Sequence, residues 1–228
     1  MTIFSSKKFL LLPFLLLSGL LFSQEDFSVY AEPEFSLNIE SDSRWSYNFG
    51  VGNRNLILQN ETDQLRVQHL ELSQFTSYEV GFYSKLSLGL RYRFREVFED
   101  SREDEIRITQ QYGRSRKFNR VKIAHRIRFE ERFREQTSFR SRYEFSVEFP
   151  LSGDRVDEKE FFMVTNTEAL WSMGKQQKPS FEHRFGISVG NELFRNTKLD
   201  IGLEYRLDDY TQATTHELFI LTGINLSI

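Results

Sequence analysis

The residues of this sequence that could do chemistry are few, and they do not form a recognisable catalytic set. A serine hydrolase needs a serine and a histidine on one face, with a third polar group to orient the imidazole. His125, His183 and His216 share the phase of the apolar residues around them, and so does Ser141. A hairpin between His125 and Ser141 would leave them roughly 20 Å apart along the strands at the usual rise per residue. Because they could not exchange a proton, the sequence predicts no catalytic residues and no enzyme.

Metal and cofactor chemistry has equally little support. The sequence holds no His-Glu-x-x-His motif and no cysteine, which excludes thiolate ligands, cysteine nucleophiles and disulfides. The acidic residues Glu99, Asp100, Glu103 and Asp104 could bind a divalent cation, although a solvated loop explains them as well. We therefore predict neither a metal nor a cofactor.

The first residues have the pattern of a secretory signal peptide. Lys7 and Lys8 precede an apolar run, Phe9–Phe22, which is shorter than the roughly 20 apolar residues that a membrane helix needs. This pattern predicts a signal peptide over residues 1–23, cleaved on export from a bacterial cytoplasm. An uncleaved anchor helix is the alternative.

The remainder, residues 24–228, is long enough for one domain, and the composition of the whole chain has an unusual balance. The chain has 23 Phe and 9 Tyr beside 28% charged residues, with a mean hydropathy of -0.49. No second apolar run is long enough for a membrane helix, but a membrane β-barrel needs only alternate residues to face lipid. The 30 basic and 33 acidic residues nearly cancel, which argues against a nucleic-acid partner.

From Phe27 onward the dominant signal is an alternation of apolar and polar residues, which is typical of β-strands. Leu88, Leu90 and Tyr92, for example, alternate with Arg91 and Arg93. About eleven segments show this pattern, and since bacterial barrels favour even strand numbers we expect 10 or 12. The least regular stretch covers residues 65–80, where the phase slips. The predicted fold is all-β: an antiparallel up-and-down transmembrane β-barrel of about 10–12 strands.

Alternation alone does not say which face of the strands is in contact with water, but the size of the barrel indicates it. A closed barrel of ten or more strands has an interior too wide for one layer of side chains to fill. An apolar interior would be a large dry void or would need a ligand, whereas a polar interior can hold water and paired charges. We therefore expect the aromatic face to meet lipid and the charged face to line the lumen.

The charged residues of two predicted hairpins can be assigned to facing pairs from the sequence. A turn centred on Gln136 predicts that Arg128 faces Glu144 and that Glu130 faces Arg142. Opposite charges that face each other stabilise the pairing of the two strands. They also keep both carboxylates ionised, which favours a structural role over the acid and base pair of a glycosidase. A turn near Phe194 similarly predicts that Arg184 faces Glu204 and that Glu182 faces Arg206. The predicted lumen-facing charged lattice consists of Arg91, Arg93, Arg126, Arg128, Glu130, Arg140, Arg142, Glu144, Arg184, Glu204 and Arg206.

The segments His125–Phe133 and Phe139–Tyr143, preceded by Glu105–Gln111, resemble the pattern of the family known as domain of unknown function 2490 (DUF2490). The resemblance extends over most of the mature chain. It implies an exported outer-membrane β-barrel of a Gram-negative bacterium and carries no catalytic residues to this sequence.

Together these observations favour a non-enzymatic outer-membrane barrel that acts as a narrow pore, a binding shell or a structural element. Its expected partners are outer-membrane lipids, the barrel-assembly machinery and periplasmic chaperones. Two alternatives stay open: an outer-membrane lipid-modifying enzyme, and a soluble periplasmic barrel with its aromatic face turned inward around an apolar ligand. The sequence does not indicate an oligomeric state.

Overall fold

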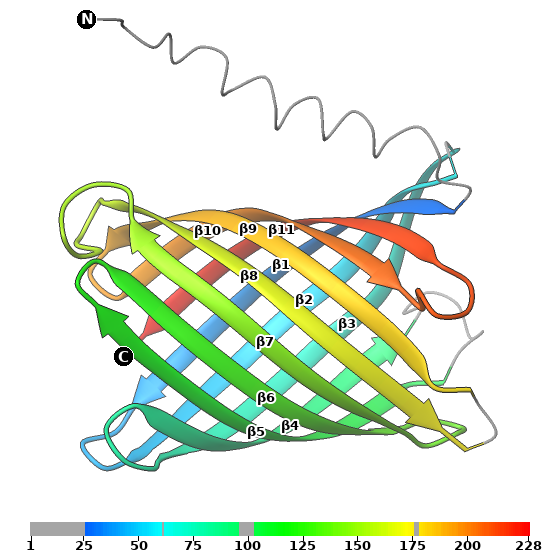
Figure 1. Cartoon of the computed structure of the whole chain (residues 1–228), viewed down its shortest axis with the longest axis horizontal. Helices are drawn as coiled ribbons and strands as arrows, with labels where there is room; N and C mark the ends of the chain where they lie inside the picture. The colour runs from blue at the N-terminus through cyan, green and yellow to red at the C-terminus, as the bar shows by residue number, and fades with distance from the viewer. Residues whose placement is uncertain (1–25, 61, 96–102, 176–177) are drawn as a thin grey trace, which may run out of the picture.

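The computed structural model describes residues 26–60, 62–95, 103–175 and 178–228, and this part of the chain forms a closed β-barrel (Figure 1). The predicted signal peptide and two of the acidic loop residues, Glu99 and Asp100, lie outside the described residues. The described part holds no helix long and apolar enough to cross a membrane. Its strands are β1 Phe27–Glu40, β2 Trp45–Gln59, β3 Thr62–Glu79, β4 Ser84–Arg95, β5 Glu105–Phe118, β6 Val121–Phe133, β7 Ser138–Pro150, β8 Phe161–Gly174, β9 Ser180–Phe194, β10 Thr197–Asp208 and β11 Thr215–Ser227.

The alternation of the sequence becomes an alternation of environment along each strand, which β5 shows most clearly. Glu105, Arg107 and Thr109 are buried inside the barrel, with at most 3% of their surface exposed. The residues between them, Ile106 and Ile108, are 42% and 37% exposed on the outer face. Successive side chains of a strand point to opposite faces, so the sequence sends its charges inward and its apolar groups outward.

Each strand pairs with its chain neighbour in an antiparallel hairpin, and the barrel closes between β1 and β11. Those two strands run parallel, with Phe27 opposite His216 and Asn38 opposite Ser227. A parallel closure is required because the described residues form eleven up-and-down strands, so the first and last point the same way. The expectation of an even strand number was therefore wrong, although the barrel class and the range of 10–12 strands are confirmed.

The irregular phase in β3 has a local cause. Arg54 of β2 pairs with His69, but the next residue, Asn55, pairs with Val67. Gln68 is thus an extra residue, and such a β-bulge moves the following residues to the opposite face. The apolar phase changes from odd to even positions, which is why the alternation slips near Leu70.

The two ends of the barrel are distinguished by the direction of the chain (Figure 1). We call the end where β1 begins the N rim; Phe27, Ser138 and Asp208 mark it. We call the opposite end, where β11 ends, the C rim; Glu40 and Pro150 mark it. Because neighbouring strands are antiparallel, every second loop belongs to the same rim.

Candidate functional site: the charged barrel interior

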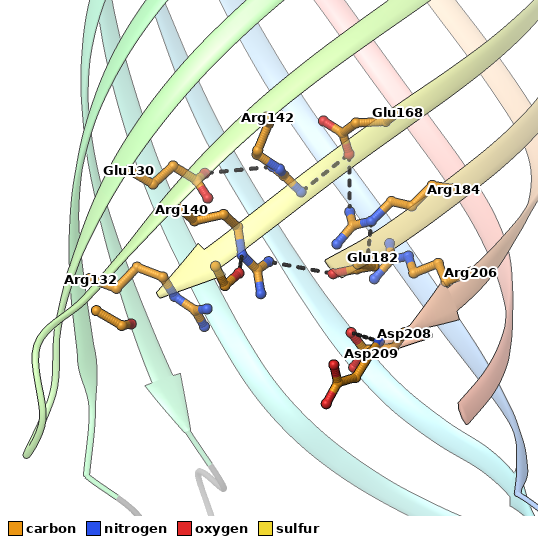
Figure 2. Close-up of polar contacts among 12 residues, drawn as sticks. Glu130, Arg132, Arg140, Arg142, Glu168, Glu182, Arg184, Arg206, Asp208 and Asp209 are labelled. Carbon is orange, nitrogen blue, oxygen red and sulfur yellow. Dashed lines mark hydrogen bonds and ion pairs between the residues drawn. The ribbon is translucent and has the colours of Figure 1, made fainter. Parts of the chain in front are cut away.

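A row of ion pairs runs along the inner face of four neighbouring strands, from β6 to β9 (Figure 2). Arg142 lies 3.5 Å from Glu130 and 3.4 Å from Glu168. Glu168 in turn lies 3.5 Å from Arg184. All four side chains are at least nine-tenths buried. Each charge is therefore compensated by a neighbour on another strand, which buried charges require.

The row of ion pairs continues toward the N rim through Glu182 (Figure 2). Glu182 accepts a 2.5 Å hydrogen bond from Arg184 and lies 3.8 Å from Arg140. Arg140 also donates through Nε to the hydroxyl of Ser172 at 2.8 Å. Strands β7, β8 and β9 are thus connected by side chains as well as by their backbone ladder.

At the N-rim end of the neighbouring strand β5, Glu105 is the centre of an arginine cluster. It is 1% exposed and pairs with Arg107 on its own strand. Its second oxygen lies 3.0 Å from both Arg132 and Arg134. One carboxylate therefore serves three guanidinium groups, so cations outnumber anions locally.

The seam between β11, β1 and β2 is filled differently, by an apolar cluster inside the barrel. Phe219 is fully buried and stacks on Tyr30, with ring centroids 4.7 Å apart, and Leu56 packs beside them. The guanidinium of Arg206 lies 3.4 Å from the centroid of Phe219, and that of Arg54 lies 4.7 Å from it. Cation–π contacts therefore connect this cluster to the charged network.

Two of the cavities between the side chains have opposite character, and we call them chambers. The N-rim chamber is a cavity of about 230 Å³ with a lining made entirely of charged residues. Its lining comprises Arg54, Arg91, Arg93, Arg107, Arg132, Arg140, Arg142, Arg184, Arg206, Glu32, Glu182, Asp208 and Glu217.

The C-rim chamber has a volume of about 320 Å³, and acidic residues outnumber arginines in its lining. Its charged residues are Glu32, Glu34, Glu144, Glu168, Asp200, Glu204, Arg126, Arg142, Arg184 and Arg206. Four residues line both chambers and form what we call the partition: Glu32, Arg142, Arg184 and Arg206. Ion-paired side chains thus project into the described interior where the two chambers meet.

Comparison with known proteins places this barrel in a family. The sequence model of the family described as "Protein of unknown function (DUF2490)" matches residues 27–217 of the 228-residue chain. The chain belongs to the DUF2490 family. No curated protein matches the sequence. The match starts at the first residue of β1 and ends at the third residue of β11. The family model therefore covers nearly the whole barrel of this DUF2490 member.

All eleven residues of the predicted charged lattice are buried or line one of the two chambers. Those not yet described have partners too. Arg91 and Arg93 lie 3.0 and 2.5 Å from Glu71, and Arg126 pairs with Glu144. Arg128 donates to the side-chain oxygen of Gln111 at 2.8 Å, and Glu204 accepts from Arg206 at 2.6 Å.

The register predicted for the β6–β7 hairpin was wrong by two residues. Glu144 faces Arg126 instead of Arg128, and Arg128 faces Arg142. The physical reason is the turn, which centres one residue earlier than Gln136 and moves every pair by two. Arg142 nevertheless reaches Glu130 along the diagonal at 3.5 Å, so that predicted ion pair forms without facing positions.

The β9–β10 hairpin shows the same error. Arg206 faces Arg184, and Glu204 faces Gly186. Arg195 and Asn196 form the turn, with Asn196 at φ 68°, and a bulge follows at Thr197. Arg184 and Glu204 still approach to 4.0 Å diagonally, and the predicted partner of Arg206, Glu182, pairs with Arg184 instead.

Several central residues were missing from the predicted lattice. Glu32, Glu71 and Glu168 pair with its arginines, and Glu105 pairs with Arg107, Arg132 and Arg134, which the prediction also left out. Glu32 and Glu105 are in the polar phase of regular strands, so the alternation could have found them. The alternation is weaker around Glu71 and Glu168. The seam residue Phe219 could not have been found this way, because an aromatic residue in the inward phase carries no sequence signal of its own.

The histidines of the outer face have hydroxyl partners from tyrosine and threonine. Hydrogen bonds join His125 to Tyr143 at 2.9 Å, His183 to Thr167 at 2.8 Å and His216 to Tyr205 at 2.6 Å. Ser141 faces Phe129 and Trp171, and His125 faces Phe145. Ser141 is thus four residues from the level of His125, roughly 13 Å, which is nearer than expected and still too far for proton transfer.

The described residues contain no group of three or more histidine or acidic side chains arranged to hold a metal ion. Asp104 of the acidic loop accepts hydrogen bonds from the Tyr92 hydroxyl at 2.7 Å and from the Arg95 amide at 3.1 Å. This carboxylate therefore has a structural role at the N rim.

Proposed function

We propose that this chain is a non-enzymatic outer-membrane β-barrel of a Gram-negative bacterium that acts as a binding shell for small charged solutes. The observation that carries the proposal is the inverted distribution of polarity: charged residues fill the interior and large apolar residues cover the outside. Such an arrangement suits a barrel surrounded by lipid. The alternative soluble barrel would need the opposite arrangement, with its aromatic side chains inside.

The apolar outer surface supports insertion because it is continuous around the barrel. The largest apolar patch on a typical soluble monomer covers a few hundred Å², whereas here every strand contributes exposed apolar side chains. We call this surface the outer belt; it includes Phe35, Phe49, Leu72, Leu88, Leu90, Ile108, Ile127, Phe129, Phe139, Tyr143, Trp171, Phe185, Ile187, Ile201, Leu203, Ile220 and Ile224.

The divided interior supports a binding shell over an open pore. The two chambers have volumes of about 230 and 320 Å³ and meet at the partition, where Arg142 and Arg184 are both paired with Glu168. A hydrated ion that passed between the chambers would come close to these paired charges. We therefore expect strong restriction of flow and retention of small polar solutes.

Envelope fractionation tests the location. Cells expressing the full chain with a C-terminal tag are separated by density and selective detergent extraction, and fractions are run on gels with and without boiling. We expect recovery of the cleaved protein in the outer membrane, with migration that changes on heating. Recovery in the soluble periplasmic fraction would overturn the proposal.

Conductance separates the shell from a pore. Purified barrel is added to a planar lipid bilayer in concentrated potassium chloride, with an open porin as reference. We expect conductance steps at least tenfold smaller than those of the porin. Steps of porin size would contradict the binding shell and leave the membrane location intact.

A further inference from the structure

We infer that the N-rim chamber is a binding site for a compact phosphate-type oxyanion, with inorganic pyrophosphate as the representative probe. This inference deepens the proposed function and depends on it, because it names the solute class and places it in one chamber. The geometry points to this chamber because three independent properties of its lining agree.

The first property is the charge of the lining. Nine of its thirteen residues are arginine and four are acidic. The carboxylates behind the lining are shared: Glu71 pairs with both Arg91 and Arg93, and Glu105 pairs with Arg107 and Arg132 as well as Arg134. Shared carboxylates leave the guanidinium groups facing the chamber only partly compensated. The chamber therefore attracts anions.

The second property is unused hydrogen-bonding capacity. Within the described part of the chain, the Nε groups of Arg132 and Arg142 are buried and have no hydrogen-bond acceptor. The Nε of Arg126 in the C-rim chamber also has none, so this property counts only together with the positive charge of the N-rim lining. Both residues are 9% exposed. A guanidinium is a rigid fork of donors whose geometry matches phosphate and carboxylate oxygens. An oxyanion would supply acceptors and negative charge together.

The third property is size and polarity. A volume of about 230 Å³ corresponds to the liquid volume of roughly eight water molecules. Because every lining residue is charged, an apolar ligand body would find no complementary surface. The chamber thus fits one or two phosphate groups and excludes an acyl chain or a peptide.

The C-rim chamber provides a comparison within the same protein. It also contains arginines, but acidic residues such as Glu144 and Asp200 are in the majority. Arg126 lines this chamber, pairs with Glu144 and does not line the N-rim chamber. Replacing it removes the same charge from the interior without touching the proposed site.

The test is isothermal titration calorimetry of the folded full-length mature barrel in a non-ionic detergent. Its folded state is first verified by heat-modifiable migration. Pyrophosphate is titrated at constant ionic strength, with chloride and a short-chain lipid phosphate as comparison ligands. Variants Arg140→Gln and Arg93→Gln alter the N-rim chamber, and Arg126→Gln is the matched control.

We expect saturable pyrophosphate binding that weakens at least tenfold in Arg140→Gln and in Arg93→Gln and changes less than twofold in Arg126→Gln. Chloride and the lipid phosphate should not compete, since the first lacks the oxyanion geometry and the second does not fit. Absence of saturable binding, equal weakening in Arg126→Gln, or preference for the lipid phosphate would each overturn the inference. If one of these results is obtained with a correctly folded barrel that is recovered in the outer membrane, the inference is wrong and the proposed function is not affected. If the protein is recovered as a soluble protein, the proposed function itself is contradicted.

Discussion

The outer belt and the interior are built from the same strands, one residue apart, yet they depend on different kinds of contact. Phe129 of the outer belt is 57% exposed, while its neighbours Arg128 and Glu130 are 9% and 2% exposed. The apolar side chains outside need only a surrounding that is itself apolar. The charges inside need specific partners at specific positions, because an unpaired buried charge is costly. Substitutions at adjacent positions should therefore have different consequences for different reasons.

The largest effect is expected where a shared interior carboxylate is removed. Glu105→Gln would leave Arg107, Arg132 and Arg134 without their common anion. We expect the free energy of unfolding to fall by about 3–5 kcal/mol, as when one partner of a buried ion pair is lost. Urea-induced unfolding of the barrel in liposomes measures this change.

The matched control is Glu148→Gln. Glu148 pairs at 3.2 Å with Lys122, whose side chain is 46% exposed, so its loss should cost at most about 1 kcal/mol. Equal effects of the two substitutions would mean that the interior charges are fully hydrated and that pairing matters little.

A smaller loss is expected when a charge is placed in the outer belt. Leu90→Arg puts a cation on the outer face of β4, where it would contact hydrocarbon. We expect a loss of about 2–4 kcal/mol in liposomes. Phe82→Arg is the control, since Phe82 lies in the β3–β4 loop with 98% of its surface exposed. If Phe82→Arg costs as much as Leu90→Arg, the outer belt is not in contact with lipid.

The smallest of these effects concerns an apolar residue that lies on the interior side. Phe219→Leu removes the ring that contacts Arg54 and Arg206. We expect a loss of about 1–2 kcal/mol, because a desolvated cation–π contact contributes an amount of this order. Phe129→Leu on the outer face should change the unfolding free energy less, since lipid can fill the space. A larger loss of unfolding free energy for Phe129→Leu than for Phe219→Leu would mean that aromatic packing matters more on the outer face than inside. That result would contradict the comparison between the outer belt and the interior.

The sequence was sufficient to predict the face of the charged residues in regular strands, because that face depends only on strand parity. In β10, for example, Glu204 and Arg206 were predicted to face the lumen, and both are buried. The predicted charged lattice was also chosen by parity, and all of its residues are buried or line one of the two chambers. The sequence did not predict the inward position of Phe219 or the change of phase at the bulge in β3.

The sequence was not sufficient to predict which charges pair. Both tested hairpins were displaced by two residues because register depends on the turn, and the five residues from Phe133 to Thr137 do not fix its centre by their types. A shift of two keeps parity, so the faces were correct while the partners were not. The bulge at Gln68 and the odd strand number likewise depend on how strands meet, which a pattern along one strand does not contain.

The most direct test of the central claim, that the apolar face meets lipid and the charged face does not, compares two consecutive residues. Thr165 faces Ile187 of the outer belt, whereas Asn166 lines the C-rim chamber. The chain has no cysteine, so Thr165→Cys and Asn166→Cys can each carry one small fluorophore. In liposomes containing brominated lipids, we predict strong quenching of the label at position 165 and little at position 166. Equal quenching, or stronger quenching at position 166, would contradict the account.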